Sequence, residues 1–333
     1  MHPRTLLALR PTLRGVVVAA VAAASLWMAA SFGARALNAV VVPAVVVLLG
    51  AALSLLALDR PTLTRSSPKS GFPGDERTVT LTFDTEDPFV GVVDDDLPDG
   101  VDGDATVETL VGEEPVSYDV TYRARGVHEV GPVRVRARDV LGLAERAFAW
   151  DDRSVALVYP RVHPLSGAVV SRLEAGLDER PDADRDEFDH LREYVHGDSL
   201  RDIHWKTSAR RDDLVVQSFR ADRETPTVSI AASADPGRAD AMAEATASVG
   251  AAFLADGISV VVSTPGGRVE ASPGDRARLL EHLASVESGP AATDGADVTI
   301  HAGDDTEVAV GGERLSFDRL RDGLVAPQEV VAA

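Results

Sequence analysis

The chain has 333 residues, which suggests two or three domains, and no cysteine, which excludes disulfides, cysteine-ligated zinc and thiol catalysis. Its net charge is −20, but residues 1–65 carry six arginines against one acidic residue, Asp59, for a balance of +5. The remainder therefore carries −25, which is opposite to the charge that a nucleic-acid-binding surface needs. Because only Lys69 and Lys206 are lysines, the composition is typical of a halophilic protein, from a salt-loving microbe.

Two uncharged apolar runs come first in the chain, "GVVVAAVAAASLWMAASF" and "LNAVVVPAVVVLLGAALSLLAL". Each is about long enough to cross a hydrocarbon core of about 30 Å, and inside lipid each must be helical to satisfy its own backbone groups. The sequence thus predicts a transmembrane hairpin within residues 1–62, with helices at about 15–33 and 37–58. Pro43 is expected to kink the second helix.

Positive residues flank both outer ends of this hairpin, and these are Arg4, Arg10, Arg14, Arg60, Arg65 and Lys69. The short turn between the helices holds only Arg35. The positive-inside rule therefore predicts that both termini and the soluble domains are cytoplasmic. The alternative is a signal peptide cleaved near "SFGA", which would leave one anchor and an outward-facing envelope or adhesion protein.

Short alternating β-patterned runs, such as "RTVTLTF" and "VSYDVTYRA", predict an antiparallel β-sandwich over residues 63–160. Between them lies the acidic run "DDDLPDGVDGD" (residues 94–104). A calcium-loop frame that begins at Asp95 puts Leu97 on a ligand position and Thr106 where the terminal glutamate should stand. A solvated loop is the better interpretation.

Strand and helix patterns alternate over residues 213–333 and predict an α/β domain with a mainly parallel sheet. The expected strands lie at 214–219, 227–231, 258–264, 297–302 and 306–310, and the expected helices at 237–257 and 275–288. The sequence has no Walker phosphate loop, no GxGxxG after a strand, no GxSxG and no HExxH. No catalytic residue and no cofactor are therefore expected.

A connector over residues 161–212 contains the charged run "HGDSLRDIHWKTSARR". Gly197 can end one helix, and Asp198 or Ser199 can cap the next, predicted from Leu200 to about Arg211. The charges of this helix then pair locally at a spacing of four residues. A structural or docking cluster is the favoured interpretation.

Two chemical alternatives remain for the same run. His190, His196 and His204 could bind zinc together with Asp198, although their spacings of six and eight do not follow a helix face. A metal-dependent hydrolase built on His196, Asp198 and His204, or a His–Asp acid–base pair, would use the same residues. No nucleophile accompanies them in the sequence.

The chain resembles the domain of unknown function 58 (DUF 58) family in four pieces taken in order. These are the apolar hairpin, then "RG" with "GPVRV" and "DVLGL", then "YP", and finally "REYVHGDSLRDIHWKTSARRDDLVVQSF". The last piece carries the most specific motif, formed by Tyr194, Gly197, Asp198, Arg201, Ile203, Trp205, Ala209 and Arg210. Among them, we expect Asp198, Arg201, Trp205 and Arg210 to fasten a domain junction or present it to a partner.

The resemblance implies a membrane-anchored protein of α+β multi-domain class. Its parts would be the transmembrane hairpin, the β-sandwich and a Rossmann-like α/β domain similar to the von Willebrand factor A fold. It further implies a scaffold role beside a MoxR-type AAA+ ATPase and other membrane proteins in the lipid bilayer, in the assembly or maturation of envelope or metal-dependent complexes. It establishes no enzymatic reaction.

Domains of the von Willebrand type often bind a divalent cation such as magnesium through D-x-S-x-S after the first strand. Here the corresponding run is "AASAD", in which Ala231 stands in place of the aspartate. Ser233 matches the first serine and Asp235 falls on the second. A degenerate metal site at Ser233 and Asp235 is the weaker expectation, because alanine offers no oxygen ligand.

Overall fold

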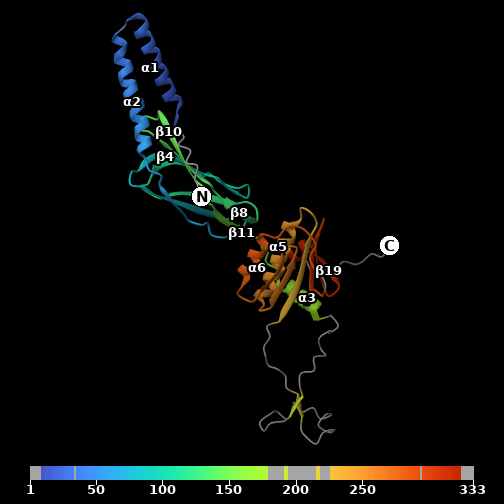
Figure 1. Ribbon diagram of the computed structural model, residues 1–333. Coiled ribbons are helices and arrows are strands. Elements are labelled where there is room, and N and C mark those ends of the chain that lie inside the picture. Colours follow the sequence, from blue (N-terminus) through green and yellow to red (C-terminus); the bar gives the residue numbers. More distant parts are fainter. Residues whose placement is uncertain are drawn as a thin grey trace. The chain divides into compact units, whose positions relative to one another are not determined.

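The computed structural model describes the chain over residues 9–33, 35–178, 191–193, 215–217, 226–292 and 295–323 (Figure 1). The chain divides into two compact units. The first comprises Met1–Arg161 with Leu280–Ser285, and the second comprises Val162–Leu279 with Val286–Ala333. The first unit contains the apolar helices and the β-sandwich, and the second contains the α/β sheet.

Two apolar helices, α1 (Leu13–Phe32) and α2 (Asn38–Ala57), form the predicted hairpin. Each has 20 residues and is long and apolar enough to cross a membrane, and most of its side chains are exposed in the molecule. Thr12 caps α1 by accepting a hydrogen bond from the Gly15 amide, as a residue before a helix should. A short 3-10 turn, η1 (Arg35–Leu37), leads into α2.

Both helices are joined to one strand of the sandwich, β10 (Ala144–Trp150). The short strand β1 (Leu9–Pro11), which directly precedes α1, pairs antiparallel with it. The Arg146 side chain on β10 donates hydrogen bonds to the carbonyls of Leu55 (2.8 Å) and Leu58 (2.5 Å) at the end of α2. A cation at the carboxyl end of a helix satisfies carbonyls that lack helical partners.

The sandwich consists of antiparallel strands, as the alternating patterns predicted. Besides β1 and β10 they are β2 (Thr62–Arg65), β3 (Glu76–Asp84), β4 (Phe89–Asp95), β5 (Val101–Gly103), β6 (Thr106–Val111), β7 (Val116–Tyr122), β8 (Gly126–Val130), β9 (Val133–Arg138) and β11 (Ser154–Val158). One sheet has the order β1-β10-β9-β4-β6 and another the order β2-β3-β7-β5, while β8 pairs with β11. Their inward side chains, including Leu81, Tyr122 and Val135, form one buried core.

The acidic run at residues 94–104 departs from the expected solvated loop. Asp95 belongs to β4, and its side chain is fully buried. Its two carboxylate oxygens each lie 2.9 Å from a guanidinium nitrogen of Arg65, and the Tyr118 hydroxyl donates to one of them. The buried charge is thus paired and hydrogen-bonded. Arg65, counted above as a flanking charge of the hairpin, is used inside the sandwich.

The "DVLGL" piece forms the turn between β9 and β10. The Asp139 carboxylate accepts hydrogen bonds from the amides of Leu141 (2.9 Å), Leu143 (2.6 Å) and Ala144 (2.7 Å), which fixes the turn. Gly142 supplies the left-handed conformation there, with a φ of 65°. This turn also holds the start of α1. The Thr12 hydroxyl donates to the Gly142 carbonyl (2.6 Å), and the Thr12 amide donates to the Leu143 carbonyl (2.9 Å).

The second unit is built on a six-stranded sheet of order β16-β15-β14-β17-β18-β19. Its strands are β14 (Thr227–Ala234), β15 (Ser259–Thr264), β16 (Gly267–Ala271), β17 (Val298–Ala302), β18 (Thr306–Val310) and β19 (Glu313–Ser316). The helices α3 (Gly167–Asp178), α5 (Ala239–Ala255) and α7 (Phe317–Arg321) belong wholly to the unit. A further helix, α6 (Arg276–Ala284), begins in this unit, and its residues from Leu280 onward belong to the first. Figure 1 shows helices packed beside this sheet.

The sheet is less parallel than the sequence predicted. Only β15, β14 and β17 run parallel, joined through α5 and α6, whereas β16, β18 and β19 add antiparallel edges through tight turns. The turns at residues 265–266 and 311–312 are too short for a crossover helix, which a parallel pairing would require. The prediction of a mainly parallel sheet was therefore wrong at both edges.

Candidate functional site

The carboxyl end of β14 is the place where an α/β sheet of this order would hold a ligand. β14 lies between two parallel partners, β15 and β17. The chain crosses from β14 to β15 on one side and then from β15 to β17 on the other, so the direction of the connections reverses at β14. Ligands of open α/β sheets bind in the crevice outside the carboxyl ends of such strands. The predicted residues Ser233 and Asp235 lie at this end.

His301 of β17 joins these two residues, and the sequence analysis missed it. The Ser233 hydroxyl and His301 Nδ1 share a hydrogen bond of 3.1 Å, and His301 Nε2 lies 3.7 Å from Asp235 Oδ1. The register of β14 against β17 explains the contact, because Ser233 stands directly beside His301. The signal available in the sequence was the histidine near the end of the predicted strand at 297–302.

This serine–histidine–aspartate series is open to water. The His301 and Asp235 side chains are 54% and 61% exposed. A catalytic series of this kind needs a buried carboxylate and a water-excluding cleft with aimed donors, so exposure argues against nucleophilic catalysis. Among the residues that the structure describes, no three His, Asp or Glu side chains are grouped to hold a metal ion. Magnesium binding at Ser233 and Asp235 stays a prediction.

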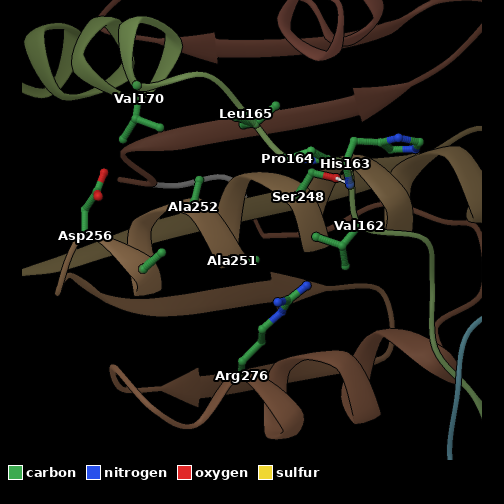
Figure 2. A pocket seen from close by; sticks show the side chains of 12 residues that line it. Val162, His163, Pro164, Leu165, Val170, Ser248, Ala251, Ala252, Asp256 and Arg276 are labelled. Carbon is green, nitrogen blue, oxygen red and sulfur yellow. Dashed lines mark hydrogen bonds between the residues drawn. The ribbon is translucent and has the colours of Figure 1, made fainter.

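A second site in the same unit is a pocket of about 390 Å³ on the outer face of α5 (Figure 2). Its floor consists of small residues of that helix, Ala251, Ala252 and Ala255, and its side wall of the segment 162–170. Polar groups stand at its rim, and its volume suits a small molecule or the side chains of a bound peptide. The full set of lining residues is Val162, His163, Pro164, Leu165, Gly167, Val170, Ser248, Ala251, Ala252, Ala255, Asp256 and Arg276.

The wall segment is fastened to α5 through His163. The backbone amide of His163 donates to the buried Ser248 hydroxyl (3.0 Å), which itself donates to the Glu244 carbonyl (2.6 Å). The His163 ring lies edge-on to Phe317 at 6.0 Å, and its Nε2 is 3.5 Å from a carboxylate oxygen of Glu244. The pocket is therefore held in shape by hydrogen bonds and ring packing.

Charge at the pocket is confined to two side chains. Figure 2 shows Asp256, which follows α5, and Arg276, which begins α6, on different sides of the alanine floor. Both are exposed, so a bound group could contact either one from solvent. The sequence offered a weak signal for this site, since α5 carries alanines on the side away from its buried residues Met242 and Phe253.

The family-motif residues lie outside the described residues, and these are Tyr194, Gly197, Asp198, Arg201, Ile203, Trp205, Ala209 and Arg210. The same is true of His190, His196 and His204, so the zinc and hydrolase alternatives stay predictions. The segments that flank the motif are described: β12 (Leu191–Glu193) pairs antiparallel with β13 (Val215–Gln217). Within the predicted strand at 214–219, the described residues 215–217 pair with β12.

Comparison with known proteins gives a partial family match. Residues 190–300, about a third of the chain, match the model of the family described as "Protein of unknown function DUF58". This range contains the motif, the ladder β12–β13 and the sheet from β14 into β17.

One curated relative is similar to this chain over a longer segment. The "Uncharacterized protein YeaD" of Bacillus subtilis (strain 168) is 31% identical over 166 residues. The match covers 45% of this chain and 42% of that protein, so the chain spans less than half of its relative's length.

Two solved structures are similar to a smaller part of the chain. The PKD domain of an M14-like peptidase from Thermoplasmatales archaeon SCGC AB-540-F20 is 16% identical, with a TM-score of 0.23, and the match covers 31% of this chain and 98% of that one. A complex of human zinc 2-glycoprotein and prolactin-inducible protein is 19% identical, with a TM-score of 0.23, and the match covers 30% of this chain and 96% of that one. These scores are too low to extend the description of the fold.

Proposed function

We propose that this chain is a membrane-anchored interaction scaffold that works with a MoxR-type AAA+ ATPase in the assembly or maturation of envelope or metal-dependent complexes. The observation that carries the proposal is the attachment of two exposed apolar helices to the sandwich through β1 and Arg146. Such helices need a bilayer, because water would not tolerate so much exposed apolar surface. The match of residues 190–300 to the DUF58 model supports the choice of partner class.

The pocket on α5 is the surface on which we expect the partner to act. It is open, its floor is apolar and its rim carries one acidic and one basic side chain, Asp256 and Arg276. An apolar anchor with a polar rim is the usual composition of a protein-binding hot spot. The α/β unit would then receive the ATPase, and in this proposal its fold is similar to the von Willebrand factor A fold.

Co-purification from mild detergent tests the proposal. The full chain should recover a MoxR-type ATPase, and Ala252→Trp should lower the recovery about tenfold, equivalent to about 1.4 kcal/mol, because the indole fills the pocket. Ala277→Trp is the matched control, since Ala277 is an exposed alanine of α6 that does not line the pocket. Arg276→Glu provides a second test that adds no bulk.

Two results would count against this assignment. Stringent pull-downs that never recover an AAA+ ATPase would remove the partner class. Equal recovery by wild type, Ala252→Trp and Arg276→Glu would move the contact away from the pocket. Melting curves of the three proteins must coincide first, so that lost binding is not lost folding.

We further propose that both ends of the hairpin face the cytoplasm. Arg10, Arg14, Arg60 and Arg146 lie at the sandwich end of the hairpin, whereas the turn has Arg35. This distribution follows the positive-inside rule even after Arg65 is excluded. Since the chain has no cysteine, Ser31→Cys and Ser67→Cys give clean single-site probes.

A membrane-impermeant maleimide distinguishes the two orientations in intact cells. It should label the protein with cysteine at position 31 and leave the one with cysteine at position 67 unlabelled until the cells are lysed. The reverse pattern would support the outward-facing alternative.

A further inference from the structure

The turn between β9 and β10 exposes apolar side chains that do not contribute to the buried core of the sandwich. Val140 is fully exposed and Leu141 is 55% exposed, at the tip of a turn whose backbone is fixed by Asp139. Tight turns normally carry polar residues, because their side chains face water. Leu13, the first residue of α1, is 81% exposed next to the same turn.

Hydrogen bonds set the position of this turn relative to the anchor. Thr12 donates to the carbonyls of Gly142 and Leu143, so the turn lies within a few ångströms of the first residue of α1. The close approach is also seen at Gly15, where an added Cβ would lie 2.0 Å from the Leu143 carbonyl oxygen. The turn cannot move along α1 without breaking these contacts.

The length of α1 converts that position into a depth in the membrane. Its 20 residues rise about 30 Å, which equals the thickness of the hydrocarbon core. Leu13 therefore lies at the boundary between acyl chains and head groups when the helix spans the bilayer. The turn, bonded to Thr12, lies at the same boundary.

The polar groups around the turn suit phospholipid head groups. A pocket of about 370 Å³ beside the turn is lined by Thr12, Leu13, Arg14, Arg138, Gly142 and Glu145. Arg138 is neutralised by Glu145 at 2.7 Å, whereas the exposed Arg14 forms no ion pair with any residue that the structure describes. An arginine beside an apolar tip is the arrangement that binds anionic interfaces.

We infer that the β9–β10 turn is a second membrane contact, in which Val140 and Leu141 insert at the head-group boundary of an anionic phospholipid bilayer beside the anchor. The inference rests on the membrane anchoring proposed above. It makes the sandwich a membrane-seated domain, held to the lipid at its turn as well as through the hairpin.

Single-cysteine labelling of the full chain in mixed phosphatidylcholine and phosphatidylglycerol vesicles tests this. An environment-sensitive nitrobenzoxadiazole label is placed at Leu141→Cys, at Val155→Cys on β11, and at Val21→Cys within α1. These three side chains are similarly exposed, at 55%, 51% and 49%. β11 pairs with β8 and not with the strands at the base of the hairpin.

Nitroxide lipids then report the depth of each label. We expect the label at 141 to shift to the blue and to be quenched most strongly by nitroxides near the head group. The label at 21 should be quenched most strongly by nitroxides deep in the acyl chains, and the label at 155 by neither. Quenching at 21 with a solvent-like label at 141 would overturn the inference and leave the anchor intact. Absence of quenching at 21 would instead overturn the anchor, and the inference with it.

Discussion

At the scale of single residues, the first unit depends on a few contacts between distant parts of the chain. Gly15 is one, because α1 approaches the Leu143 carbonyl so closely that a Cβ would lie 2.0 Å from its oxygen. Asp95 is another, because its buried carboxylate is neutralised by Arg65 from β2. Neither role follows from local sequence, since the partners are 128 and 30 residues away.

Replacing Gly15 with alanine should loosen the base of the hairpin. The methyl group would force α1 away from the β9–β10 turn and strain the hydrogen bonds of Thr12. We expect a lower thermal unfolding midpoint in detergent. Gly50→Ala in α2 is the matched control, because an added Cβ there meets no atom within 4 Å. Equal midpoints for both variants would contradict the close contact.

Removing Arg65 should destabilise the sandwich strongly. Arg65→Met leaves the Asp95 carboxylate buried without its cation, which costs about 3–5 kcal/mol in comparable cases. Denaturant unfolding measures the loss, and Arg65→Met with Asp95→Leu should recover much of it by removing the stranded charge. Arg123→Met breaks an exposed pair with Asp102 and should change little. If Arg65→Met alone were as stable as wild type, the buried pair would be excluded as a determinant of stability.

At the scale of secondary-structure elements, the sequence predicts the positions of helices and strands better than it predicts how the strands pair. The apolar runs predicted both helices of the hairpin to within about two residues at the ends, because apolar length decides such a helix. The sequence pattern also predicted the strand–helix–strand succession of β15, α6 and β17. The strands β16, β18 and β19 pair antiparallel through short turns, and only the register of the folded sheet shows this.

The candidate site was half predictable for the same reason. Ser233 and Asp235 follow from their place at the end of a strand, but His301 reaches them only because β14 pairs in register with β17. The pocket on α5 could be predicted only from the hydrogen bond between His163 and Ser248, which are 85 residues apart in the chain. Contacts of this separation carry no local periodicity.

The helix α6 should make unfolding sensitive to mild acid. Burial lowers the pKa of His282 below its ordinary value of 6.5. As pH falls through that value, the unfolded chain takes up the proton before the folded chain, so the free energy of unfolding decreases below about pH 6.5 and is unaffected by this group at higher pH. Chemical denaturation from pH 8 to pH 5 should show a smaller loss for His282→Gln than for wild type. Parallel curves for the two proteins would show that the group has no such role.

At the scale of the whole molecule, the charge of −20 predicts dependence on salt. Acidic groups repel one another across the folded surface, and mobile ions screen that repulsion. The thermal midpoint of the purified chain should rise by several degrees from low salt to molar potassium chloride. Sodium chloride should act alike, because screening depends on ionic strength. A midpoint that is the same with and without molar salt would exclude the halophilic interpretation.

The attachment of both β1 and the end of α2 to the single strand β10 also has a mechanical consequence. Two helix ends bound to β10 give the sandwich two points of support, so it cannot swivel about the anchor as a domain on one flexible linker would. In the membrane-anchored state proposed above, its tilt against the bilayer normal would thereby be restricted. A partner that diffuses in the same bilayer would meet this sandwich in a restricted set of orientations, and the rate of encounter would follow the number of molecules per membrane area and not per volume of solution.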